Sequence, residues 1–218
     1  QAGLPSGTSP RSIEGWVKLA AEPTTWCWIV SYGVSGNAFF LGFSADRVSF
    51  GGYGDDVYYT TDLAAYVNQW IYMTGTYDGT TARLYFNGVQ VASSAKTWNL
   101  TLSKAYIGRQ VNDSEYLNGT IDEVRIYNRV LSAAEITALY EFYNPGVVIS
   151  DLQKGLVGNW KFDGNAKDAT PGSDHGTVTG ATLSADQKGQ SNKAYIFDGN
   201  DNIYMPSTTI LAANSSYT

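Results

Sequence analysis

Aromatic and acidic side chains are crowded into one glycine-rich stretch of the chain. Aromatic rings stack on the C–H faces of sugars, and carboxylates or amides hold sugar hydroxyls in place. The stretch reads as a loop, so we expect its side chains to form a carbohydrate-binding surface. The alternative interpretation is that each ring packs in the core or along an edge strand. The residues are Tyr53, Asp55, Asp56, Tyr58 and Tyr59.

Trp98 and Asn99 form a second pair with the same chemistry, an aromatic ring beside an amide. We expect this pair to be exposed and to take part in ligand binding. Trp16, Trp70 and Trp160 lie inside strand-like patterns instead, so we expect them to pack in the core.

Pairs of carboxylates suited to acid–base hydrolysis are absent from the strand patterns. Two carboxylates of one strand share a face only when they stand at alternate positions. Asp122 and Glu123 are adjacent, as are Asp55 and Asp56, so the members of each pair would point to opposite faces. The single histidine, His175, has no partner for zinc or nucleophilic chemistry. We therefore expect no enzyme and assign no catalytic residue.

The composition excludes two classes of partner. The 218-residue chain has a net charge of −6 and a pI near 4.7, so it offers no basic stripe for nucleic acid. It also lacks a run of about 18 apolar residues, so we expect no membrane insertion. Its one cysteine, Cys27, lies in an apolar run and is expected to be a buried free thiol. No signal peptide is recognisable, so export is inferred from class alone.

Short runs of aromatic and β-branched residues predict an all-β protein. Asp78-Gly79 and Asn87-Gly88 separate consecutive runs and predict two tight reversals that join three strands. Ser132 and Glu135 have the spacing of a capping box. They predict a short helix over residues 131–142. Strands are predicted at residues 12–19, 26–32, 38–43, 47–51, 70–77, 81–86, 105–107 and 156–162.

Two blocks of sequence resemble one known family. The first is NQWIYMTGTYDG (68–79) followed by RLYFNG (83–88), and the second is GTIDEVRIYNR (119–129) followed by LSAAEI (131–136). Both blocks resemble the laminin-G-like, concanavalin A-like jelly rolls, and the resemblance covers residues 12–142. It implies an all-β, concanavalin A-like jelly-roll β-sandwich with one short helix.

The end of the chain resembles the beginning of the same kind of domain. GLVGNWKFDG (155–164), HGTV (175–178) and AYIFDG (194–199) are similar to the family's opening, which here follows the rest. The resemblance therefore predicts a domain that is circularly permuted or cut from a tandem array.

This order suggests a division of the chain into three parts. Residues 1–144 are interpreted as the central and C-terminal part of the jelly roll, residues 145–154 as a connector, and residues 155–218 as the N-terminal part. Either part alone would expose unpaired strand edges. We therefore expect the last part to complete the sandwich, in the same chain or in a neighbouring copy.

The resemblance also implies a structural calcium ion between the opening loop and a closing strand. Calcium takes about six to eight oxygen ligands, which carboxylates, an amide and loop carbonyls can supply. The alternative is that these side chains only stabilise turns. The implied ligands are Asp122, Asp163, Asn165 and Asp168.

Together these observations predict an extracellular or cell-surface, non-catalytic binding or adhesion module for glycans or other surface ligands. The first alternative is a structural subunit of a surface fibre or pilus, assembled head to tail by exchange of half-domains between copies. The second alternative is a concanavalin A-like glycosidase, suggested only by kinship of fold.

Overall fold

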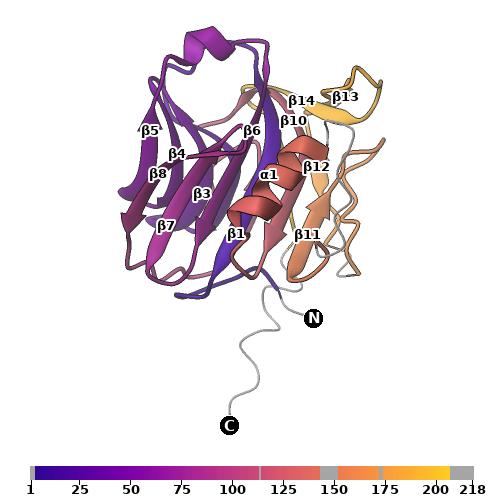
Figure 1. The fold of residues 1–218 in the computed structure, drawn as a ribbon. Helices are drawn as coiled ribbons and strands as arrows, with labels where there is room; N and C mark the ends of the chain where they lie inside the picture. Colours follow the sequence, from indigo (N-terminus) through magenta and orange to yellow (C-terminus); the bar gives the residue numbers. More distant parts are fainter. Residues whose placement is uncertain (1–2, 113, 143–151, 172–173, 207–218) are drawn as a thin grey trace.

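Two antiparallel sheets stack face to face, and one short α-helix lies on the outside of one of them (Figure 1). The computed structural model describes residues 3–112, 114–142, 152–171 and 174–206. The prediction of a jelly-roll β-sandwich with one short helix is confirmed, and the helix that the capping box predicted is α1 (Ala133–Phe142).

The first layer is an eight-stranded sheet in the order β13-β14-β10-β1-β6-β7-β8, with β11 paired to β10 beside that path. β1 lies in the middle of this path, because it pairs with β10 along one edge and with β6 along the other. The strands are β1 (Arg11–Leu19), β6 (Trp70–Tyr77), β7 (Thr81–Phe86), β8 (Val89–Ala95), β10 (Asn118–Tyr127), β11 (Leu156–Trp160), β13 (Thr182–Ser184) and β14 (Ala194–Asp198).

The second layer is a seven-stranded sheet in the order β12-β15-β9-β2-β3-β4-β5. A 3-10 helix, η1 (Leu63–Tyr66), connects its edge strand β5 to β6 of the other sheet. The strands are β2 (Cys27–Val34), β3 (Asn37–Ser44), β4 (Arg47–Gly52), β5 (Asp55–Thr60), β9 (Lys104–Ile107), β12 (Thr177–Thr179) and β15 (Asn202–Tyr204).

The predicted meander of β6, β7 and β8 is confirmed, and its turn residues explain it. Asn87 and Gly88 have φ of 49° and 78°, the left-handed conformation that a two-residue hairpin turn requires. In the preceding turn, Oδ1 of Asp78 accepts hydrogen bonds from the backbone N–H of Thr80 and of Thr81. Local sequence therefore sets both reversals.

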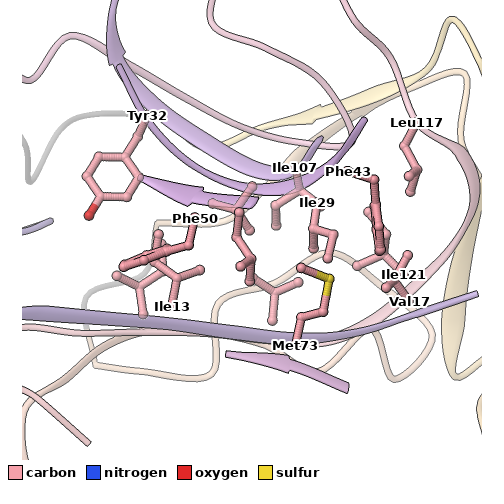
Figure 2. Close-up of a cluster of buried hydrophobic side chains, with 14 of the residues drawn as sticks. Ile13, Val17, Ile29, Tyr32, Phe43, Phe50, Met73, Ile107, Leu117 and Ile121 are labelled. Atoms are coloured by element: carbon pink, nitrogen blue, oxygen red, sulfur yellow. The ribbon is translucent and has the colours of Figure 1, made fainter. Parts of the chain in front are cut away.

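The core lies between the two sheets, where side chains from both layers interdigitate (Figure 2). Ile13 and Met73 project from one sheet, and Ile29 and Phe50 from the other; all four are fully buried. The backbone of Gly75 makes room for this packing, because a Cβ there would collide with the ring of Phe50. A larger residue at this position would push the layers apart.

The C-terminal strands belong to these same two sheets. β11 and β14 both pair with β10, and β15 pairs with β9. The pairs Val124–Trp160 and Ile107–Ile203 illustrate how residues far apart in sequence become neighbours. The strand edges that residues 1–142 would leave open are thus occupied within the chain. The division into permuted half-domains, and exchange between copies, stay predictions.

Helix α1 covers part of the outer face of the eight-stranded sheet (Figure 1). The capping box is formed: Ser132 Oγ accepts from the N–H of Glu135 at 3.2 Å, and Glu135 Oε2 accepts from the N–H of Ser132 at 2.8 Å. Tyr140 of the helix stacks on Trp16 of β1, with ring centroids 5.7 Å apart. The aromatic side chains on this outer face are therefore buried by the helix.

One segment differs from the sequence prediction. The glycine-rich stretch is not one loop, because residues 55–60 form strand β5, paired with β4. Only Tyr53 and Gly54 form the turn between the two strands, and Gly54 has a φ of 72°. Val57, with its β-branched side chain, is buried in the sandwich. The aromatic and β-branched residues of this stretch behave as strand formers rather than as a loop.

Candidate ligand-binding site

A pocket of about 220 Å³ opens on the outer face of the seven-stranded sheet, and we call it the aromatic pocket. Strand register explains how its parts meet. Asp56 pairs with Gly51, which pairs with Phe40, and directly paired residues project from the same face. The residues that line the pocket are Trp26, Trp28, Phe40, Tyr53, Gly54, Asp56, Gln110 and Glu115.

Two tryptophans at alternate positions build the main wall of the pocket. Cys27 and Ile29 point into the core, so the flanking Trp26 and Trp28 point outward. Their rings stack with centroids 5.2 Å apart and planes 10° apart. Trp28 is buried and Trp26 is half-buried, so the outer ring is the one that solvent reaches. Burial raises the pKa of the Cys27 thiol to about 12, so the thiol is unreactive.

The ring of Trp28 lies flat because its cross-strand partner is Gly42. A Cβ at Gly42 would lie 2.6 Å from Cε3 of Trp28, so only glycine lets the indole rest on the neighbouring strand. On its other side, Trp28 contacts the ring of Phe40, with centroids 4.1 Å apart. The three outward-facing rings are therefore fixed by packing before any ligand arrives.

The loop between β9 and β10 supplies the polar wall. Glu115 Oε2 accepts a hydrogen bond of 2.7 Å from the indole Nε1–H of Trp28 and another from the side-chain amide of Gln110. The backbone N–H of Gln110 donates to the carbonyl of Ser114 and closes the loop. Glu115 has a φ of 57°, a left-handed conformation that is costly for a non-glycine residue. These bonds hold its carboxylate at the pocket.

The β4–β5 hairpin supplies the remaining wall. Tyr53 at its tip is 54% exposed, the largest exposed aromatic fraction at the pocket. Asp56 follows on β5, and its Oδ2 is buried without a hydrogen-bond partner among the described residues. The pocket thus combines rigid aromatic faces with two carboxylates, a combination suited to a ligand with both apolar faces and hydrogen-bond donors.

The structure places the sequence-predicted ligand residues in three different environments. Tyr53 and Asp56 line the aromatic pocket. Asp55 and Asn99 line an adjacent depression of about 210 Å³, which Tyr53 also borders. Tyr58 lies on exposed strand β5 outside both, as does Tyr59.

The expectation that Trp98 is exposed is wrong. Its side chain is 6% exposed and packs edge-on against Phe39 and Phe50. Gly51 and Gly52 make this possible, because a Cβ at either position would collide with the indole. Trp98 therefore belongs to the core, although it also borders the adjacent depression. The three tryptophans that were predicted to pack in the core are Trp16 and Trp160, which are buried, and Trp70, which is half-buried.

The residues implied as calcium ligands all have partners of their own. Asp168 accepts from the backbone N–H of Asn159 and from Thr170, and Asn165 accepts from the N–H of Lys167. Among the residues that the structure describes, no three carboxylates, histidines or cysteines are grouped so that they could hold a metal ion. In this arrangement Asn165 and Asp168 hold the backbone of the loop that follows β11.

Asp122 is the implied ligand whose carboxyl has a strongly raised pKa. It is 2% exposed, and burial, together with the charges of Glu123, Asp186 and Asp163, raises the pKa of its carboxyl to about 8. Its Oδ1 accepts from the N–H of Glu123. Asp163 is near enough to repel it but is itself paired with Lys193 at 3.0 Å. Calcium binding by the implied residues stays a prediction.

Several pocket residues were missed from the sequence. Trp26 and Phe40 lie in apolar runs that were interpreted as buried strands, and Gln110 and Glu115 lie in a loop that contains no recognisable motif. The sequence did contain one signal, because Trp26 and Trp28 stand two positions apart with an apolar residue between them. That pattern places both rings on the face opposite the core.

A comparison with protein families identifies the class of protein. Residues 2–137 match the concanavalin A-like lectin/glucanases superfamily. The match spans more than half of the chain, and the two-sheet sandwich of the structure is consistent with it. The chain belongs to this superfamily. No curated protein matched by sequence.

Solved structures share the fold at low sequence identity. A candidate carbohydrate-binding protein from Bacteroides ovatus ATCC 8483 has a TM-score of 0.57 and 17% identity over 94% of this chain and 55% of its own. A heptameric SAP-like pentraxin from Limulus polyphemus has a TM-score of 0.50 and 13% identity over 64% and 73% of the two chains. The binding domain of Botulinum Neurotoxin DC, solved with SialylT, has a TM-score of 0.50 and 15% identity over 62% and 36%.

The chain thus covers just over half of the Bacteroides chain and about a third of the neurotoxin chain. At these identities the likeness establishes the fold alone. Within the described part of the chain, no helix has the length and apolarity needed to cross a membrane.

Proposed function

We propose that this chain is an extracellular, non-catalytic module that binds glycans through the aromatic pocket. The observation that carries the proposal is the set of outward-facing rings of Trp26, Trp28 and Tyr53, held beside the carboxylates of Asp56 and Glu115. Sugar rings present C–H faces to aromatic side chains and hydroxyl donors to carboxylate oxygens. The extracellular location rests on the lectin-like class of the fold.

The size of the pocket supports a small recognition unit. Its volume of about 220 Å³ is below the range of roughly 300–1,000 Å³ typical of pockets for drug-sized ligands. A single sugar residue, with its neighbours lying across Tyr53 and the adjacent depression, suits this size. We therefore expect recognition of one residue of a chain rather than enclosure of an oligosaccharide.

The carboxylates favour binding over hydrolysis. Glu115 is occupied by the donors of Trp28 and Gln110. The adjacent pair Asp122 and Glu123 is no better placed, because Glu123 pairs with Arg125 at 2.5 Å and Asp122 is buried. A panel of polysaccharides incubated with the protein should release no reducing ends; release that is lost in Glu115→Gln would contradict the non-catalytic role.

A glycan array followed by calorimetry tests the proposal. We expect Tyr53→Ala to weaken binding of any glycan found on the array by about tenfold or more, because exposed aromatic anchors dominate binding energy. Tyr59→Ala is the matched control, since Tyr59 is 37% exposed on the same hairpin, outside the pocket. Equal losses in both variants, or no glycan bound at all, would refute the assignment of the site.

A further inference from the structure

The charged groups of the aromatic pocket are hydrogen-bond acceptors. Two donors that line the pocket are used inside the protein, because the indole N–H of Trp28 and one N–H of the Gln110 side-chain amide both donate to Glu115. The charged side chains of the lining are the carboxylates of Glu115 and Asp56. A ligand held against these carboxylates must bring hydrogen-bond donors of its own.

Asp56 is the pocket carboxylate that has an oxygen without a hydrogen-bond donor in the described part of the chain. Its Oδ2 is shielded from water and lacks a hydrogen-bond partner among the described residues. A buried carboxylate oxygen without a donor is unfavourable, because it has lost its hydration without replacement. Asp56 lines the pocket, so a turn of its side chain would bring this oxygen to a donor on the ligand, and a charged donor would bind it most strongly.

The charged side chains that line the pocket are all negative. Among the described residues that line it, two are carboxylates and none is lysine, arginine or histidine. Basic side chains on the elements around it are engaged elsewhere: Arg47 of β4 pairs with Asp46 at 3.1 Å, Lys96 pairs with Asp55 at 2.6 Å, and the guanidinium of Arg109 lies 3.9 Å from the ring centroid of Tyr106. The whole chain carries a net charge of −6. An acidic glycan would therefore be repelled here.

The aromatic rings of the pocket also favour a positively charged ligand. The faces of tryptophan, tyrosine and phenylalanine carry negative quadrupole potential, which attracts a cation placed over them. Trp26 and Tyr53 present accessible rings at the mouth, and Phe40 closes the floor. An ammonium group between these rings and the two carboxylates would meet favourable charge on every described side.

We propose that the aromatic pocket recognises a glycan bearing a free, protonated amino group, as in a chain of β-1,4-linked glucosamine. The inference rests on the proposed glycan-binding function and specifies its ligand. The ammonium lies against Asp56 and Glu115, and the sugar ring lies on Trp26 and Tyr53. Replacing the ammonium by a hydroxyl removes the charge, and replacing it by an acetamide also adds bulk.

The test uses three β-1,4-linked oligomers of equal length that differ only at C2: glucosamine, N-acetylglucosamine and glucose. Calorimetry on the full chain should give at least about tenfold tighter binding for the glucosamine oligomer. Raising the sodium chloride concentration should weaken that binding and leave any binding of the glucose oligomer unchanged. A lysine-rich peptide of equal charge serves as a fourth ligand.

Charge-removing variants locate the interaction. Asp56→Asn and Glu115→Gln keep the side-chain shapes, and each should reduce the preference for the glucosamine oligomer by about tenfold. Asp55→Asn is the matched control, because Asp55 is a neighbouring carboxylate that lies outside the aromatic pocket. Thermal melting of each variant verifies that it folds, and Asp56→Asn decides the result where Glu115→Gln does not fold.

The outcomes separate this inference from the broader one. Equal affinity for the three oligomers, a preference for the N-acetylated one, or preferred binding of the lysine-rich peptide would overturn the amino-sugar assignment. If other glycans bind through Tyr53 in those cases, the proposed function still stands. Absence of binding to every glycan, on the array and in calorimetry, would overturn both.

Discussion

The two outer faces of the sandwich carry similar aromatic side chains, but, among the described elements, a helix covers only one of the two aromatic clusters. On the eight-stranded sheet, Trp16 and Tyr72 lie beneath helix α1, where Tyr140 stacks over them. On the seven-stranded sheet, Trp26 and Trp28 stack in the same manner but border an open pocket. Aromatic residues on an outward face therefore serve stability where an element covers them, and remain available for a ligand where none does.

The largest expected effect concerns the covered face. Trp16→Ala should lower the free energy of unfolding by about 3–5 kcal/mol, because it leaves a cavity under the helix. Trp16 is 7% exposed and contacts both Tyr72 and Tyr140. Chemical denaturation measures the change. A loss below about 1 kcal/mol would mean that the helix does not rely on this contact.

The second prediction concerns the open face. Trp26→Ala should cost about 1 kcal/mol or less in unfolding free energy, yet weaken glycan binding at least about tenfold. The half-buried ring contacts Trp28 and lines the pocket, so we expect it to contribute more to the free energy of ligand binding than to that of folding. Denaturation and calorimetry on the same variant give both values. A large stability loss with unchanged affinity would reverse the comparison.

The third prediction concerns the helix that makes the faces differ. Hydrogen bonds from Arg129 lower the pKa of Glu135 to about 2 from its ordinary 4.5. Because the folded-state pKa is the lower one, this stabilisation is complete above pH 4.5 and is lost as pH falls towards 2. Glu135→Gln keeps the capping geometry but removes the charge. It should cost about 1 kcal/mol at neutral pH.

The pH profile provides the control for this variant. The difference in unfolding free energy between the wild type and Glu135→Gln should shrink as pH falls from 4.5 to 2. A difference that stays constant over this interval would assign the effect to packing rather than to the ion pair.

The smallest expected effect concerns calcium. Binding near the buried carboxylate of Asp122 would relieve repulsion from Asp163 and Asp186, and should raise the melting temperature by about 2–4 °C. Melting in calcium and in chelator measures this shift, and Asp122→Asn should abolish it. Glycan binding at the aromatic pocket should be unaffected. Identical melting curves would contradict a calcium site at these residues.

Much of the fold could be predicted because its signals are local. Asn87-Gly88 requires only its own backbone conformation, and Ser132 with Glu135 satisfies one helix end within four residues. The resemblance of the last part to a family opening then predicted that this part completes the sandwich. Pairing of β14 with β10 could be anticipated only through that resemblance, since nothing in either strand specifies its partner.

The site was less predictable because exposure depends on distant residues. Trp98 is buried only because Gly51 and Gly52 leave space for its ring. Glu115 reaches the pocket only because its loop crosses to Trp28 of another strand. Tyr53 and Asp56 were found because a tight turn and its flanking strand present them together, which is a local property.

Indole N–H signals in a heteronuclear NMR titration test the central claim most directly. On addition of the glucosamine oligomer, or of another glycan that the array identifies, the signals of Trp26 and Trp28 should shift while those of Trp16 and Trp160 stay in place. Assignment follows from single tryptophan-to-phenylalanine variants. Shifts confined to Trp16 or Trp160, with Trp26 and Trp28 unmoved, would contradict the claim that the uncovered aromatic face is the binding site.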